Sequence, residues 1–149
     1  MISKIMHSNI IKLKAEDTLS KALEIINENK INGAPVVDDD GNLVGMIVKA
    51  DIYRFLMEEG HYETCPVDWV MTKKVITAST REDILDIAKR LRENDIIAVP
   101  ITDKGIIVGI VTIEDIMDYI IEKYSKWSEN RKTHALFRCL GFLAKSLFV

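Results

Sequence analysis

Cysteine is scarce in this sequence, with only two residues among 149. A disulfide framework is therefore excluded, and Cys65 and Cys139 are most simply free thiols in a reducing cytoplasm. Proline and glycine number only three and seven, which excludes collagen-like and low-complexity chains. No signal-peptide pattern follows Met1, and no apolar run is long enough to span a membrane. We therefore expect a cytoplasmic protein.

The chain also has little net charge, −3 at pH 7. General nucleic-acid binding usually requires a basic surface, so this balance argues against it. Hydrophobic residues make up 48% and charged residues 29% of the sequence. These values are ordinary for a globular protein and exclude a disordered chain.

The sequence contains an internal repeat. Residues 33–38 resemble residues 98–103 at an offset of 65 positions, and an offset of 64 then pairs Asp51 with Asp115. The one-residue difference falls in a turn, where a surface hairpin tolerates it. The repeat extends over most of residues 4–124, so we interpret it as a duplication.

Each copy predicts the same order of elements. An apolar run at residues 9–13 or 74–78 predicts a first strand, and an amphipathic helix follows. Two β-rich runs then flank a turn that contains Gly41 or Gly105, as in a hairpin. A second helix closes the copy. The prediction is an α/β fold of two β-α-β-β-α repeats.

A unit of about 60 residues buries so little surface that it is only marginally stable alone. We therefore expect the two repeats to pack as one pseudo-twofold pair. The predicted domains are repeat 1 at residues 1–60, a linker with repeat 2 at 61–124, and a basic amphipathic helical extension at 125–149.

The repeat resembles a tandem pair of cystathionine-β-synthase (CBS) domains, called a Bateman module. The segments that carry the resemblance are 6–7, 32–36 and 45–51 in the first copy and 71–72, 97–101 and 109–115 in the second. The resemblance implies a regulatory, non-catalytic module that binds AMP, ADP, ATP or S-adenosylmethionine in the cleft between its repeats. It also implies a homodimer that signals to an unidentified regulated partner through a conformational shift.

The residues allow this chemistry. A carboxylate at the start of a helix, such as Asp115 or Asp51, can accept hydrogen bonds from the two hydroxyls of a ribose. Thr112 can donate to a sugar or phosphate oxygen, and helix N-terminal N–H groups favour a phosphate. We expect the second site to bind more tightly, with the residues Thr72, Val75, Ile76, Ile96, Ile97, Ala98, Pro100, Thr112 and Asp115.

The first site departs from the family pattern at two positions. Val48 stands where the family has Ser or Thr, and His7 replaces the usual Thr before the first strand. Its expected residues are His7, Ile10, Ile11, Ile31, Asn32, Gly33, Pro35, Val48, Lys49 and Asp51. The alternative interpretation of both aspartates is plain helix capping.

Other chemistry has no support in the sequence. The acidic run 38–42 lacks the spacing of a calcium loop, and the three histidines are scattered. Phosphate-binding and nucleophile motifs are also missing. We therefore expect no catalysis, no metal site and no required cofactor.

The C-terminal segment 125–149 carries a net charge of +4 against −7 for the rest of the chain. Leu136, Leu140, Leu143 and Leu147 follow helical spacing. The segment is interpreted as a core or dimer-interface helix, a junction to another domain, or a membrane-surface helix. We expect residues 134–149 to form a helix that docks on the chain or on its dimer partner.

Two further functions stay open from the sequence. The chain is alternatively a nucleotide-free interaction or dimerisation module, or a transcription regulator that contacts DNA through the basic tail. A steep salt dependence of DNA affinity would support the latter.

Overall fold

The computed structural model describes residues 2–146, with side chains for residues 2–129 and 131. After a short 3-10 turn, η1 (Ile2–Lys4), the first repeat contains β1 (Leu13–Lys14), α1 (Leu19–Glu28), β2 (Gly33–Val37), β3 (Leu43–Val48) and α2 (Lys49–Leu56). A second turn, η2 (Val67–Trp69), precedes β4 (Ala78–Ser79), α3 (Ile84–Glu93), β5 (Ala98–Asp103), β6 (Ile106–Thr112) and α4 (Ile113–Ser146). This order confirms the predicted α/β fold.

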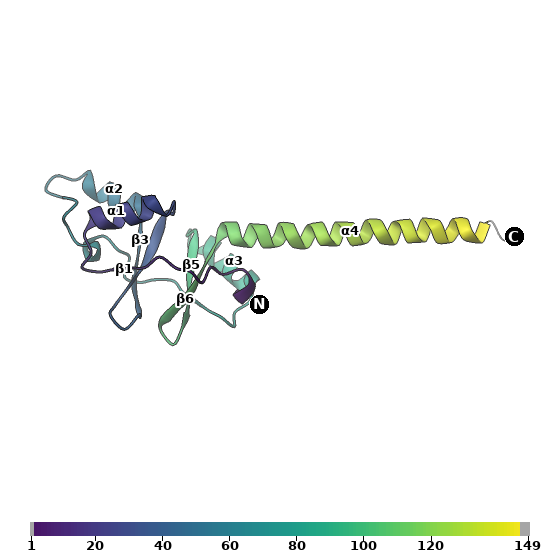
Figure 1. The fold of residues 1–149 in the computed structure, drawn as a ribbon, viewed down its shortest axis with the longest axis horizontal. Coiled ribbons are helices and arrows are strands. Elements are labelled where there is room, and N and C mark those ends of the chain that lie inside the picture. The colour runs from purple at the N-terminus through teal and green to yellow at the C-terminus, as the bar shows by residue number, and fades with distance from the viewer. Residues whose placement is uncertain (1, 147–149) are drawn as a thin grey trace.

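Each repeat forms its own three-stranded sheet. The strand order is β1-β2-β3 in the first sheet and β4-β5-β6 in the second. In each sheet the first two strands are parallel and the last two form an antiparallel hairpin. The hairpins have matching register, because Gly33 lies opposite Val48 and Ala98 lies opposite Thr112. Helices α1 and α2 lie at one end of the body, α3 and the start of α4 lie at the other, and the sheets lie between them (Figure 1).

The segment that precedes each repeat packs on the other repeat. Ile2 is fully buried in the core of the second repeat, beside residues of α3, β5 and β6. Met71 is buried in the core of the first repeat. Backbone hydrogen bonds hold the crossing segments, since His7 exchanges both of its bonds with Ile110 of β6, and Thr72 does the same with Met46 of β3.

This crossing shortens the strands that the sequence predicts at residues 9–13 and 74–78. The structure has only Leu13–Lys14 and Ala78–Ser79 as strands there. Most of the preceding residues are outside the sheets, because the chain is still passing from one repeat to the other. The strand boundaries predicted from the two apolar runs were therefore wrong, although the runs do contain residues that pack between the repeats.

Glycine makes both crossings sterically feasible. A Cβ atom on Gly45 would lie 2.5 Å from the Met71 sulfur, and one on Gly109 would lie 2.7 Å from the Met6 sulfur. Both distances are far below van der Waals contact. The glycines that align in the two copies therefore admit the methionine that begins each crossing segment.

Helix α4 runs through residue 146 and projects away from the two sheets (Figure 1). Its backbone agrees with the helix expected from residue 134 onward, as far as residue 146. The expected apolar face of residues 134–149, its docking and Cys139 lie outside the described side chains. Within the described part of the chain, no helix is long and apolar enough to cross a membrane.

Candidate functional site

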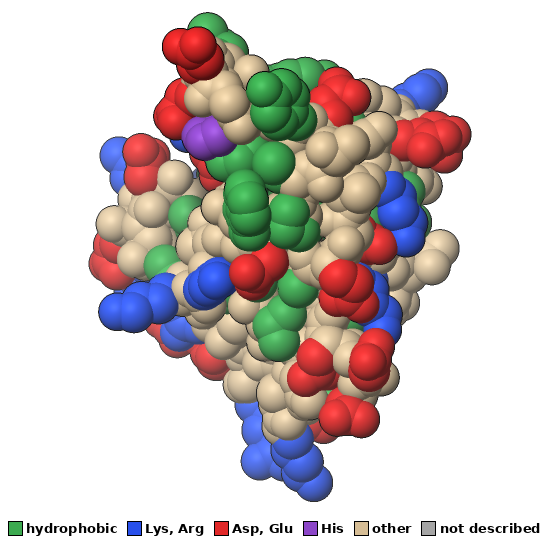
Figure 2. Space-filling model, turned by 90° about the vertical axis from the view of Figure 1, so that its left-hand side faces the viewer, with side chains coloured by type: hydrophobic (Ala, Val, Ile, Leu, Met, Phe, Trp, Pro, Cys, Tyr) green, Lys and Arg blue, Asp and Glu red, His purple; other side chains and the backbone are tan. Residues whose placement is uncertain are grey.

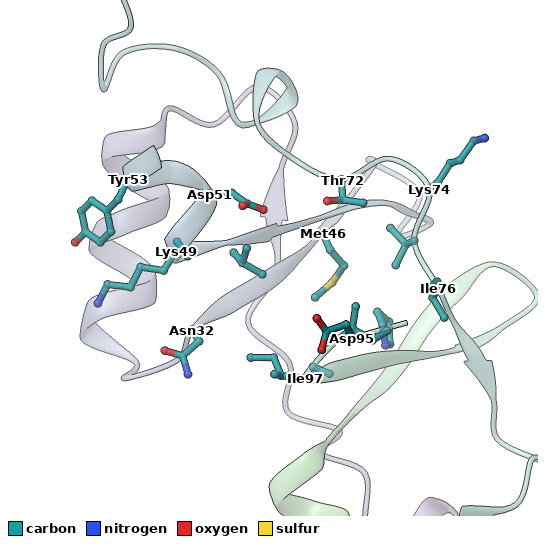
Figure 3. Close-up of a pocket in the computed structure, with 16 residues that line it drawn as sticks. Asn32, Met46, Lys49, Asp51, Tyr53, Thr72, Lys74, Ile76, Asp95 and Ile97 are labelled. Atoms are coloured by element: carbon teal, nitrogen blue, oxygen red, sulfur yellow. The ribbon is translucent and has the colours of Figure 1, made fainter. Parts of the chain in front are cut away.

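Two clefts lie where the repeats meet. The first, here called the Asp51 cleft, has a volume of about 690 Å³. Strand β3 and the first turn of α2 form one side of it, and the crossing segment 72–76 with the start of β5 forms the other (Figure 3). From the predicted sites it gathers Lys49, Asp51, Thr72, Val75, Ile76, Ile96 and Pro100.

The second, here called the Asp115 cleft, also measures about 690 Å³. The crossing segment 7–11 lies on one side of it, and β6 with the first turn of α4 lies on the other. It gathers His7, Ile10, Ile11, Ile31, Gly33, Thr112 and Asp115. Four predicted residues line both clefts, namely Asn32, Val48, Ile97 and Ala98.

The structure therefore groups the predicted residues differently from the sequence analysis. We expected each carboxylate to share a cleft with the apolar wall of its own repeat. Instead, Asp115 faces Ile10 and Ile11 of the first repeat, while Asp51 faces Val75 and Ile76 of the second. Each carboxylate faces the opposite repeat because the segment that precedes each repeat crosses to the other one.

One predicted residue lines neither cleft. Pro35 is buried within β2, so its position at the entry of the hairpin is structural. Its counterpart in the repeat, Pro100, does line the Asp51 cleft.

The two clefts correspond position by position across the repeat. Residues 46, 48, 51, 72 and 76 line the Asp51 cleft, and residues 110, 112, 115, 7 and 11 fill the matching places in the Asp115 cleft. Each pair is 64 or 65 positions apart. The clefts are thus two versions of one site, which allows a direct comparison of their polar groups.

In the Asp115 cleft, the carboxylate belongs to a reciprocal helix cap. The Thr112 amide and hydroxyl both donate to Asp115 Oδ2, at 2.7 and 2.8 Å, and the Asp115 amide donates back to the Thr112 hydroxyl at 3.2 Å. This arrangement satisfies orphan N–H groups at the start of α4. The capping interpretation therefore describes real contacts, and the hydroxyl proton of Thr112 is already used within the chain.

The other oxygen of Asp115 is held by a histidine. His7 Nε2 lies 2.6 Å from Asp115 Oδ1. An ionised carboxylate has only acceptors, so Nε2 must carry the proton in this contact. The Asp115 side chain is 13% exposed and that of His7 is 67% exposed, which places the imidazole at the mouth of the cleft.

In the Asp51 cleft, the carboxylate is more open. Val48, at the N-cap of α2, provides no side-chain hydrogen bond. Asp51 instead pairs with Arg54, one turn along the helix, at 2.6 Å. Its side chain is 33% exposed, and Figure 3 shows its oxygens turned toward Thr72 across the cleft.

Several cleft residues were missed by the sequence analysis. They are Met46, Ala50, Tyr53, Lys74 and Asp95 in the Asp51 cleft, and Asn9, Lys30, Ile110, Ile113 and Glu114 in the Asp115 cleft. Lys30 and Asp95 share one repeat position and have φ angles of 52° and 54°. Such left-handed backbone is uncommon outside glycine. A lysine does not predict it, so the sequence did not indicate that the chain turns Lys30 toward the cleft.

The charges of the clefts differ. Lys49 and Lys74 line the Asp51 cleft, where Figure 3 shows their amines at the rim, pointing away from Asp51. Ile113 and Asn9 occupy their matching places in the Asp115 cleft. Among the described residues there is no group of three histidine, cysteine or acidic side chains that could hold a metal ion.

This duplicated fold, with two related clefts at the junction of its halves, defines a tandem-repeat module with paired clefts. The chain belongs to the CBS domain family, whose model matches residues 2–58 and 67–122. An uncharacterized protein of Methanocaldococcus jannaschii, MJ1225, is 30% identical over 129 residues, which cover 87% of this chain.

Solved structures of other proteins share this fold. The CBS domain pair of protein MJ0100, in complex with 5′-methylthioadenosine and S-adenosyl-L-methionine, has a TM-score of 0.75 and 31% identity and covers 83% of this chain and 97% of that chain. CBSX2 in complex with AMP has a TM-score of 0.72 and 25% identity, covering 80% and 93% respectively.

The chain spans only part of many relatives. It covers 45% of MJ1225, 25% of a homoserine O-acetyltransferase from Methanococcus vannielii and 32% of a second Methanocaldococcus jannaschii protein. In these proteins the matching region is one section of a longer chain. Their whole-protein activities therefore belong to the longer chains.

Proposed function

We propose that this chain is a regulatory module that binds an adenosine-containing ligand in the clefts between its repeats. One observation carries the proposal: each cleft combines a carboxylate at a helix start with an apolar wall from the opposite repeat. The carboxylate suits the vicinal hydroxyls of a ribose, and the wall suits the faces of an adenine ring.

The solved relatives support the class of ligand. One of them binds 5′-methylthioadenosine and S-adenosyl-L-methionine, and another binds AMP. The groups common to these ligands are adenine and ribose, which match the common features of the two clefts. Cytoplasmic location, the binding of ADP or ATP and signalling to a regulated partner stay predictions.

The route from binding to regulation follows from the position of the clefts. Each cleft has one wall from each repeat, so a bound ligand contacts both halves of the module. A ligand that binds one relative placement of the repeats more tightly than another shifts the population toward that placement. A partner protein, or a further part of a longer chain, would respond to this shift rather than to catalysis by the module.

Calorimetric titration with AMP and with S-adenosylmethionine tests the proposal. Asp51→Ala and Asp115→Ala should each weaken binding at their own cleft by about 1.5–3 kcal/mol, because each removes a charged acceptor. Asp118→Ala, on an exposed part of α4 outside both clefts, is the control and should bind as the wild type does.

The same titrations decide between the clefts. We expected at least tenfold tighter binding, about 1.4 kcal/mol, at a site that joins Asp115 to Val75 and Ile76. Because the structure divides these residues between the two clefts, the titrations measure which cleft binds more tightly. If the wild-type chain binds neither ligand while it is folded, the interaction-module alternative replaces the proposal.

A further inference from the structure

His7 and Thr72 occupy the same place in the two clefts but make different contacts. Both are fixed by paired backbone hydrogen bonds to the neighbouring sheet, His7 to Ile110 and Thr72 to Met46. The His7 imidazole reaches Asp115 Oδ1 at 2.6 Å. The shorter Thr72 side chain lies across the cleft from Asp51, whose ion-pair partner is the highly exposed Arg54.

The hydrogen bonds of Asp115 leave little room for a ligand. Both contacts to Oδ2 come from Thr112 and belong to the start of α4. Oδ1 is the oxygen that remains for ligand hydroxyls, and His7 already takes one of its two acceptor positions. Because a ribose offers two neighbouring hydroxyls, a paired contact with the carboxylate needs both of these positions.

We infer that His7 is a gate for the Asp115 cleft: its imidazole takes the place of a ribose hydroxyl on Asp115, and a ligand must displace it. This inference rests on the proposed function. In the Asp51 cleft the partner of the carboxylate is Arg54 of the same helix and not the residue at position 72, so Thr72 leaves this cleft without a gate at the matching place. The residue that precedes the first strand of each repeat thus sets how readily the cleft admits an adenosine-containing ligand.

The size of the effect follows from exposure. His7 is 67% exposed, and exposed ion pairs contribute little free energy. Its partner Asp115 is mostly buried, and a hydrogen bond to a buried charged group contributes more. Removal of the gate should therefore tighten binding at this cleft by about two- to fivefold. A merely structural loss at position 7 would weaken binding instead.

The test exchanges the two residues. His7→Thr is made in the Asp51→Ala background, so that AMP reports on the Asp115 cleft alone, and Thr72→His is made in the Asp115→Ala background. We expect His7→Thr to tighten AMP binding and Thr72→His to weaken it, relative to each parent. His7→Gln, whose side-chain amide still donates toward Asp115, should stay close to its parent.

A nuclear magnetic resonance experiment observes the displacement directly. The imidazole signals of His7, assigned by their loss in His7→Thr, should shift when AMP binds the Asp51→Ala protein, and 2′-deoxy-AMP, which lacks one hydroxyl, should shift them less. Unchanged or weaker binding by His7→Thr overturns the gate and leaves the proposed function intact. Binding by His7→Thr where its parent shows none supports the gate, and no AMP binding by wild type or any variant overturns both.

Discussion

Asp51 and Asp115 occupy the same position in the two repeats but have different partners. Thr112 caps α4 through its hydroxyl and holds Asp115 in place. Val48, at the matching position, leaves the start of α2 without a side-chain cap. The two helix starts therefore differ by a methyl group in place of a hydroxyl, and they differ in side-chain capping and in the partners of the cleft carboxylate.

Exchange of these two residues tests that relation. Thr112→Val should lower the free energy of unfolding by about 1 kcal/mol, the usual cost of losing an N-cap hydroxyl. Val48→Thr should raise it by a similar amount, because the Val48 backbone is already extended, as an N-cap requires, with φ −115° and ψ 145°. Urea titrations of both variants measure the two changes.

The two substitutions exchange the same pair of side chains, so each serves as the control for the other. Equal loss of stability in both would show that shape, and not capping, governs these positions. No change in Thr112→Val would contradict the reciprocal cap itself.

At the scale of elements, the crossing of the N-terminal segments organises the molecule. The sequence predicted the order of strands and helices because apolar spacing and turn residues are local signals. It did not predict that residues 7–11 complete the cleft of the other repeat, because nothing local distinguishes a strand that pairs within its own repeat from a segment that crosses. Gly45 and Gly109 are where the crossing segments pass, because each leaves room for a methionine of the other repeat. This role is visible only in the packed structure.

Ile2 provides a test of the crossing. Its side chain is fully buried in the core of the second repeat, although it lies at the far end of the sequence from that core. Ile2→Ala should lower the free energy of unfolding by about 2–5 kcal/mol, because it leaves a cavity among α3, β5 and β6. Chemical denaturation monitored by circular dichroism measures this loss.

Ile106→Ala is the matched control, since Ile106 is on the edge of the same repeat and is 44% exposed. It should change the free energy of unfolding by only about 0.5 kcal/mol. If the two variants lose the same amount, the N-terminal segment does not contribute to the core of the second repeat.

At the scale of the whole molecule, apolar side chains remain exposed along the two helices that close the repeats. Met57, next to α2, is 86% exposed, and on α4 Met117, Ile120 and Trp127 are 51–54% exposed. Figure 2, which faces the end of the body where α1 and α2 lie, shows hydrophobic side chains gathered there with acidic and basic side chains around them. Exposed apolar side chains that gather on a surface are typical of an interaction site.

We therefore predict a homodimer in which the same helices of two copies face each other, because a closed twofold contact buries both surfaces at once. Sedimentation velocity at micromolar concentration should give a species of twice the chain mass of 16.9 kDa. Ile120→Glu should convert it to a monomer, since it would place two carboxylates in an apolar contact. Asp118→Lys, a change at another exposed position of α4, should leave the dimer intact.

Removal of residues 130–149 separates the contribution of the body from that of the C-terminal segment. If the shortened chain stays dimeric and Ile120→Glu still breaks it, the helices of the body carry the contact. If the shortened chain becomes monomeric, residues 130–149 provide the interface, as expected of a tail that docks on a partner copy. A monomeric wild-type chain would contradict the dimer, and the exposed residues of α4 would then need a partner other than a second copy.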